Sequence, residues 1–254
     1  KIVTKFRGEE GTTVRVTLIR EGEGKPIEIR PRRAQIITPT VEHRVFEDER
    51  IGYIGVASFS EPTAQQFAKA LQKVEGENVK GIVIDLRNNL GGLLESAVEM
   101  LSLFADDKVV VKMRMRDGRE EVAKTYVGAK RRTQTPIVVL VNSESASAAE
   151  IFAGALRDYK LATIVGEHSY GKASVQNVYS LIDGSSAKIT IARYFLPSGA
   201  DISRRVDEDG VYISGGVQPD IKAEIDPDAE FIYGDPGKDP QVAKAIEVLK
   251  KKAG

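Results

Sequence analysis

The segment from Pro136 to Glu150 reads PIVVLVNSESASAAE, and its two halves differ in character. The first half is an apolar run of strand length, whereas the residues from about Ala146 to Tyr159 follow a helical period. A short apolar run at 162–165 completes a strand, helix and strand, which form a parallel βαβ unit. The sequence therefore predicts an α/β fold with a mostly parallel sheet. Three serines lie where the strand passes into the helix: Ser143, Ser145 and Ser147.

A second unit of the same kind lies earlier in the chain. Residues 51–58 predict a strand, and Pro62 suits the first turn of a helix that ends near Gly76. The apolar run at 81–86 is typical of a strand buried on both faces. The remaining predicted elements are a helix over 93–104, hairpins at 109–114 with 120–127 and at 173–181 with 187–194, and a final helix that runs to Lys252.

The first 34 residues differ from the rest because they are too few to bury a core of their own. Alternation over 12–20 and 26–30 predicts a small hairpin, which an extended linker follows. We therefore divide the chain into an N-terminal segment with its linker (1–34), a core (35–238) and a C-terminal helix (239–254).

Composition excludes several classes of function. The chain has 37 Lys and Arg against 37 Asp and Glu, so no general attraction to nucleic acid or to an acidic membrane surface is expected. Cysteine is absent and histidine occurs only twice, which excludes thiol nucleophiles and argues against a zinc site. We expect no metal and no organic cofactor. No apolar run approaches the roughly 20 residues that span a bilayer, and a start at Lys1 indicates a mature or shortened form.

Chemistry-bearing residues follow three of the predicted parallel strands. The loop after the strand at 81–86 holds Gly91 and Gly92, the next holds the three serines, and the third holds Lys172. Ligands of α/β sheets bind beyond the carboxyl ends of the parallel strands, so the three loops are expected to converge. A hydroxyl, an amine and backbone amides can supply a nucleophile, a base and oxyanion donors. The residues alone do not choose among the serines.

Lys172 can act as a base only when its amine is neutral. A lysine with an ordinary pKa of about 10.4 needs that pKa lowered by roughly 3, which corresponds to about 4 kcal/mol. Burial lowers the pKa of an amine in this way, and the apolar flanks at 164–165 and Val175 predict a buried Lys172. Gln176 can accept a hydrogen bond from the amine without stabilising its charge.

The spacing of these residues resembles that of the carboxy-terminal processing (tail-specific) proteases. In that family the nucleophilic serine lies three residues before a glutamate and 25 before a lysine, and a glutamine follows four residues later. Ser147, Glu150, Lys172 and Gln176 have these offsets. The resemblance selects Ser147 among the three serines. It implies that Ser147 is the nucleophile, that Lys172 is the base and that Gln176 assists it.

The glycine loop carries a second part of the resemblance. Residues 85–92 read DLRNNLGG and are similar to the family's Asp-Leu-Arg-x-Asn-Pro-Gly-Gly loop, which contributes a backbone oxyanion donor. This implies an oxyanion hole formed by amides of the Gly91 and Gly92 region and of Ala148. Leu90 stands where the family has proline, which loosens the restraint on φ in this loop.

The resemblance extends over residues 35–252 and implies more than the site. It implies an α/β core rich in βαβ units and similar to the crotonase and Clp-type spiral. Residues 8–16 resemble the tail of the PDZ domain that precedes this core in the family, so 1–34 are interpreted as a PDZ-like remnant. The expected substrates are proteins or peptides with exposed C-terminal tails, and the expected location is outside the cytoplasm, as in the periplasm. Assembly into a homo-oligomer is compatible with the sequence.

Other functions fit the sequence less well. A peptide- or apolar-ligand-binding protein without catalytic activity on the same core stays open, whereas a crotonase-like acyl-coenzyme enzyme has no use for the Ser-Lys spacing. Residues 166–172 nearly spell a P-loop, yet Ala173 lacks the hydroxyl that holds magnesium and a strand follows. His168 has no carboxylate placed to orient it. The basic run at 130–132 is interpreted as a solvated turn.

Overall fold

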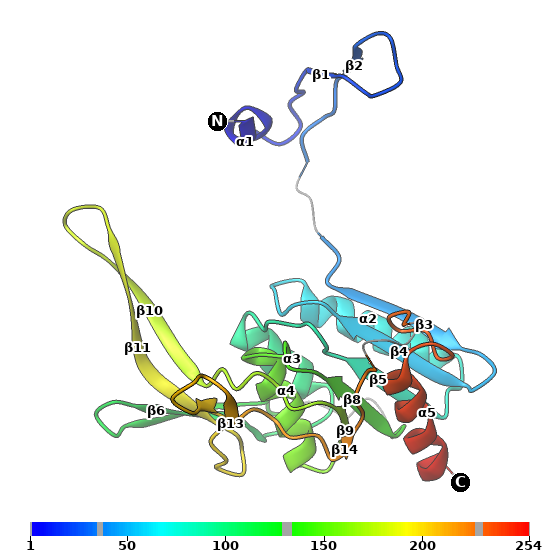
Figure 1. Cartoon of the computed structure of the whole chain (residues 1–254), viewed down its shortest axis with the longest axis vertical. Coiled ribbons are helices and arrows are strands. Elements are labelled where there is room, and N and C mark those ends of the chain that lie inside the picture. The colour runs from blue at the N-terminus through cyan, green and yellow to red at the C-terminus, as the bar shows by residue number, and fades with distance from the viewer. Residues whose placement is uncertain (1, 35–37, 129–133, 227–230, 254) are drawn as a thin grey trace. The chain divides into compact units, whose positions relative to one another are not determined.

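The computed structural model describes residues 2–34, 38–128, 134–226 and 231–253 (Figure 1). The chain divides into two compact units, residues 1–38 and 39–254. The basic run at 130–132 lies outside the described residues. Within the described part, no helix is both long enough and apolar enough to cross a membrane.

The first unit is small. It contains the helix α1 (Ile2–Phe6) and the strands β1 (Val16–Leu18) and β2 (Ile27–Ile29), which pair antiparallel. The predicted hairpin is therefore confirmed, although its strands are shorter than the alternation indicates. The Arg33 guanidinium closes the unit by donating hydrogen bonds to the Phe6 carbonyl at 2.8 Å and to the Thr12 hydroxyl at 2.8 Å. The PDZ-like origin of this unit stays a prediction.

The second unit is built on a six-stranded sheet with the order β14-β9-β8-β5-β4-β3. All neighbouring strands are parallel except β3, which runs antiparallel to β4. Every residue of β4, β5 and β8 is buried, as the apolar runs predict. The strands are β3 (Val41–Phe46), β4 (Ile51–Val56), β5 (Gly81–Asp85), β8 (Ile137–Val141), β9 (Ala162–Gly166) and β14 (Ile221–Lys222).

Helices cover both faces of this sheet (Figure 1). One face packs against α2 (Thr63–Gly76), α3 (Leu94–Ser102) and α4 (Ala148–Asp158), with Phe67 and Phe152 in the centre of that core. The opposite face packs against α5 (Pro240–Ala253). The four helices and the βαβ order of the sequence prediction are confirmed, and the mixed α/β class with them.

The strand β3 was not predicted. Its central residues Glu42, His43 and Arg44 are exposed, so it lacks the apolar pattern by which a strand is recognised. It pairs on one side only, with β4, because it forms the edge of the sheet. An edge strand with polar side chains is a common way to leave a sheet edge in water.

A second sheet has the order β10-β11-β6-β7. Both predicted hairpins are confirmed in it, and the pairing of β11 with β6 joins them. The hairpin β10–β11 projects away from the helices (Figure 1). The four strands of this second sheet are β6 (Val109–Met115), β7 (Glu120–Lys124), β10 (Ser174–Ser180) and β11 (Ser186–Phe195). A separate short pair follows, β12 (Arg205–Val206) with β13 (Tyr212–Ser214).

Candidate active site

Ser147 lies at the turn between β8 and α4, directly before the first residue of the helix. Its backbone has φ 56° and ψ −117°, a left-handed conformation that costs a non-glycine residue about 1–3 kcal/mol. The surrounding turn holds this conformation, since the Ala146 amide donates to the Asn89 carbonyl at 2.9 Å. Ser147 is half-buried, so its hydroxyl stands at the edge of the core on a sharply turned backbone.

Glu150 ties this turn to the lysine loop. Its buried carboxylate accepts hydrogen bonds through Oε2 from the amides of Ser147 and Lys172, both at 2.8 Å. Through Oε1 it accepts from the Gly171 amide at 2.6 Å and the Ser169 hydroxyl at 2.5 Å. Burial raises the pKa of Glu150, and the four hydrogen bonds oppose that shift. The sequence identified Glu150 only through its offset from Ser147, because three of its four donors come from residues 169–172, about 20 positions away.

Ser145 has a structural role. It is fully buried, and its hydroxyl donates to the Leu86 carbonyl at 2.8 Å and accepts from the Asn142 amide at 3.0 Å. Its carbonyl accepts the Tyr170 amide at 2.9 Å. Ser145 thereby joins the loops that follow β5, β8 and β9, which confirms that the three loops converge. The Ser145 hydroxyl is already engaged in two of these hydrogen bonds.

Gly91 packs directly against the Ser147 turn. A Cβ atom at this position would lie 2.6 Å from the Ala146 carbonyl oxygen and 2.9 Å from the Ala148 nitrogen, and its φ of 94° also favours glycine. The Gly91 amide donates to the Asn89 side chain at 2.8 Å, so it is occupied in this arrangement. Gly92 pairs with Phe59 in an isolated bridge. The Ala148 amide opens α4, where the first N–H groups of a helix have no intrahelical acceptor.

Lys172 and Gln176 line one depression of about 790 Å³, which reaches Ala146 beside Ser147. Both side chains are exposed, so the prediction of a buried Lys172 is wrong. The Lys172 amide donates to buried Glu150, whereas the Lys172 side chain is exposed to solvent. Gln176 donates to the Thr190 hydroxyl at 3.3 Å. Among the described residues, no hydrogen bond joins the Ser147 hydroxyl to the Lys172 amine.

His168 lies outside this arrangement. Its ring stacks on Tyr212 with centroids 3.9 Å apart and planes 4° apart, and its Nδ1 lies 3.1 Å from the Ser169 carbonyl. The sequence disfavoured His168 as a partner for serine, and in the structure its ring stacks on Tyr212.

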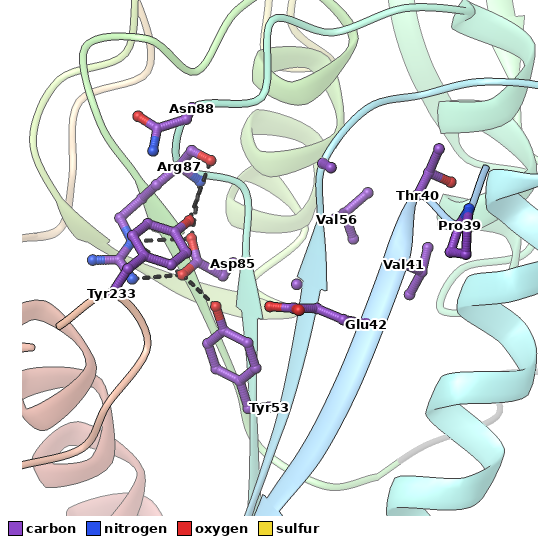
Figure 2. A pocket seen from close by; sticks show the side chains of 12 residues that line it. Pro39, Thr40, Val41, Glu42, Tyr53, Val56, Asp85, Arg87, Asn88 and Tyr233 are labelled. Carbon is purple, nitrogen blue, oxygen red and sulfur yellow. Dashed lines mark hydrogen bonds and ion pairs between the residues drawn. The ribbon is translucent and has the colours of Figure 1, made fainter. Parts of the chain in front are cut away.

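A buried ion-pair network lies at the start of the glycine loop, where β5 ends. Arg87 Nη2 lies 2.6 Å from Asp85 and 2.7 Å from Asp239, and all three side chains are buried. Figure 2 shows Tyr53 and Arg87 converging on Asp85, and the Tyr53 hydroxyl donates to it at 2.9 Å. Asp239 also accepts the amides of Gln241 and Val242 at the start of α5. The network therefore joins the end of β5 to the C-terminal helix.

Beside this network lies a cavity of about 400 Å³, shown in Figure 2. Glu42, Tyr53, Asn88 and Tyr233 are among the residues that line it. Asn88 exchanges hydrogen bonds with Asn142 at 2.8 and 2.9 Å, which fastens the glycine loop to the end of β8. None of the six predicted site residues lines this cavity.

Comparison with known proteins gives consistent matches. The profile of peptidase family S41 matches residues 50–223, which include all six predicted site residues. A carboxy-terminal processing protease, CtpA, of Bacillus subtilis (strain 168) is 35% identical over 96% of this chain and 52% of its own length. A carboxy-terminal-processing protease of Bartonella bacilliformis is 36% identical over 87% of this chain and 49% of its own length. The chain thus spans about half the length of these relatives.

A solved structure shares both the fold and part of the sequence. The photosystem II D1 C-terminal processing protease superposes with a TM-score of 0.64 and 28% identity, over 97% of this chain and 62% of that chain.

Proposed function

The chain belongs to peptidase family S41, and on that premise we propose that it is a serine endopeptidase that cleaves proteins near their C-termini. The observation that carries the proposal is the Glu150 carboxylate, which holds the amides of Ser147 and Lys172 on one oxygen. A nucleophile and a base from different loops need a shared support, because a serine hydroxyl is too weak a nucleophile without a base within reach.

The proposed reaction is an acyl transfer through Ser147. The neutral Lys172 amine takes the hydroxyl proton while Oγ attacks the peptide carbonyl carbon. The C–N bond then breaks, and the leaving amine takes the proton from the Lys172 ammonium. Water then attacks the ester carbonyl carbon and gives a proton to Lys172. The C–Oγ bond breaks and the Lys172 ammonium returns that proton to Oγ, which restores the Ser147 hydroxyl and the neutral amine. No other reactant is needed.

Because Lys172 is exposed, we propose that the bound substrate completes the active site by covering the Lys172 amine. A peptide lying across the depression covers the amine, and loss of water favours its neutral form. Gln176 lines the same depression and donates only a long 3.3 Å hydrogen bond to Thr190, so its side-chain oxygen is proposed to accept a hydrogen bond from the amine. In this proposal the catalytic arrangement is completed when substrate binds.

The oxyanion is proposed to be held by two backbone amides. The Ala148 N–H stands at the start of α4, where the helix dipole favours negative charge. The second donor comes from the Gly91 and Gly92 loop, either as the Gly92 amide or as the Gly91 amide after release from Asn89. Leu90 lacks the ring of proline, so a rotation of this loop meets less restraint.

The test is the replacement Ser147→Ala, assayed with denatured casein by gel electrophoresis. We expect cleavage to disappear, whereas Ser143→Ala in the same turn retains it. Labelling with an active-site-directed serine reagent, followed by mass mapping, should modify Ser147. Wild-type cleavage by Ser147→Ala would refute the assignment.

A peptide-binding protein without activity is the second candidate, and the exposed Lys172 without a hydrogen bond to Ser147 favours it. The two functions differ in the labelling experiment. A binder leaves Ser147 unmodified even when a bound peptide covers Lys172, whereas a protease is labelled. Export from the cytoplasm and homo-oligomer formation stay predictions from the family resemblance.

A further inference from the structure

The depression beside Lys172 is lined by three arginines, Arg193, Arg204 and Arg205, in addition to the lysine. We propose that this arginine cluster binds a carboxylate of the substrate close to the scissile bond. The inference rests on the proposed function, because it assigns a specificity element to the same site. It places the recognition of a negatively charged peptide in the core unit itself, without any contribution from residues 1–34.

The charges around the depression are unbalanced. The four cations that line it face one lining carboxylate, Glu144, which is exposed. Arg205 has a loose pair with Asp201 at 3.7 Å, and the Arg205 side chain is 67% exposed. Arg193 also attracts the Asp201 carboxylate, although in the described part of the chain neither Arg193 nor Arg204 forms a close ion pair. The chain as a whole has equal numbers of acidic and basic residues, so this excess of positive charge is local.

Arg204 is held next to the proposed base. Its amide donates to the Gly171 carbonyl at 2.9 Å, and a Cβ atom on Gly171 would lie 2.8 Å from the Arg204 nitrogen. Its guanidinium lies over the rings of Tyr170 and Tyr212, at 5.3 and 5.8 Å from their centroids. The backbone contact with the residue before Lys172 and the aromatic contacts position this cation before any ligand binds.

The donors in the depression suit a carboxylate. A guanidinium presents a planar fork that pairs with both oxygens of a carboxylate. The hydroxyls of Thr190 and Ser203 add neutral donors from the same lining. Because Ala146 and Lys172 line the depression as well, a carboxylate bound to the arginines lies a short distance along the peptide from the Ser147 hydroxyl. Two sources supply such a group: the terminal carboxylate of the chain and an Asp or Glu side chain.

The test uses four fluorogenic peptides with one common sequence. They combine a free or amidated C-terminus with Glu or Gln next to the cleaved bond. For the wild-type chain we expect kcat/KM to be higher for at least one of the two singly charged peptides than for the neutral one, mainly through KM. Arg204→Gln and Arg193→Gln should each lower that preference about three- to tenfold, mainly by raising KM for the anionic peptides. Arg119→Gln, which removes an exposed arginine that does not line the depression, is the matched control.

A charge exchange separates recognition from a structural effect. Arg204→Glu should favour a peptide with Lys in place of Glu, an effect that a merely misfolded site does not produce. Circular dichroism melting checks that each variant is folded. A preference confined to the free C-terminus assigns the terminal carboxylate, and a preference confined to Glu assigns the side chain.

The outcomes also separate this inference from the proposed function. Equal cleavage of all four peptides at low salt overturns the arginine cluster and leaves the protease intact. If no peptide is cleaved, fluorescence anisotropy of the same peptides decides: binding that prefers the anionic peptides, weakens with salt and is lost in Arg204→Gln supports the cluster alone. Binding indifferent to charge overturns it.

Discussion

The amides of Ser147 and Lys172 donate to the same oxygen, Oε2 of Glu150, each at 2.8 Å. The two nitrogens therefore lie no farther apart than twice that distance, although the residues belong to different loops. Glu150 is itself buried on the first turn of α4, so it moves only if the helix moves. The spacing of the proposed nucleophile and base is thus set through their backbones, while the Lys172 side chain stays open to a substrate.

Replacing this acceptor should weaken the fold and the site together. In Glu150→Gln, the side-chain NH₂ group faces backbone donors in place of an oxygen. We expect the free energy of unfolding to fall by about 1–3 kcal/mol, because buried donors lose their acceptor. Urea unfolding measures the loss, with Glu61→Gln on the surface as control. An unchanged free energy of unfolding would show that Glu150 does not support the loops.

The titration of Glu150 gives a separate prediction. Burial raises the pKa of Glu150 above its ordinary value of 4.5, so the folded chain holds this proton more tightly than the unfolded chain. Its contribution to stability is complete below that ordinary value and is lost as pH rises through the raised pKa. The difference in unfolding free energy between the wild-type chain and Glu150→Gln should therefore shrink as pH rises from 4. A difference that grows instead would mean that the hydrogen bonds outweigh burial.

Gly91→Ala tests the contact between the glycine loop and the Ser147 turn. The new methyl group would meet the Ala146 carbonyl oxygen at 2.6 Å, so the loop must shift away. We expect kcat to fall about 10²–10³-fold, the usual effect of losing an oxyanion donor. Gly184→Ala is the matched control, because it also has a positive φ, 82°, but no atom within 4 Å. It should cost about 1–2 kcal/mol of stability and no activity.

The buried network at the end of β5 should contribute strongly to stability. Arg87→Met leaves the carboxylates of Asp85 and Asp239 buried without their counter-ion. We expect a loss of about 3–5 kcal/mol in the free energy of unfolding. Hydrogen exchange should report early loss of protection in α5, whose first turn is capped by Asp239. Arg119→Gln removes only the exposed ion pair with Asp117 and should leave the free energy of unfolding unchanged.

Lys172→Arg separates catalysis from binding. Arginine keeps the positive charge but does not lose its proton near neutral pH, so it cannot act as the base. We expect kcat to fall by about 10²–10⁴-fold, while the affinity for an anionic peptide, measured by anisotropy, is retained. Turnover at the wild-type rate would exclude lysine as the base.

Local patterns predicted most of the second unit. The predicted apolar runs at 81–86 and 136–141 contain the buried strands β5 and β8. The helical periods predicted from Pro62 to Gly76 and from about Ala146 to Tyr159 contain the helices α2 and α4, which cover those strands. The edge strand β3 was not predicted, because its apolar residues Val41, Val45 and Phe46 lie only at its two ends. The buried network around Arg87 was not predicted either, because Asp239, with which Arg87 pairs, lies 152 positions away in the sequence. The alternation of Asp85 and Arg87 around the end of a buried strand was the one local signal of it.

For the site, periodicity alone placed three loops at one edge of the sheet, because parallel strands end on the same side. Packing decided what each side chain does there. It buried Ser145 in hydrogen bonds, turned Glu150 into the shared acceptor and left Lys172 exposed. Hydrophobic patterns specify which residues enter the core, but the acceptor of a given amide depends on which loops the finished core brings within 3 Å of each other.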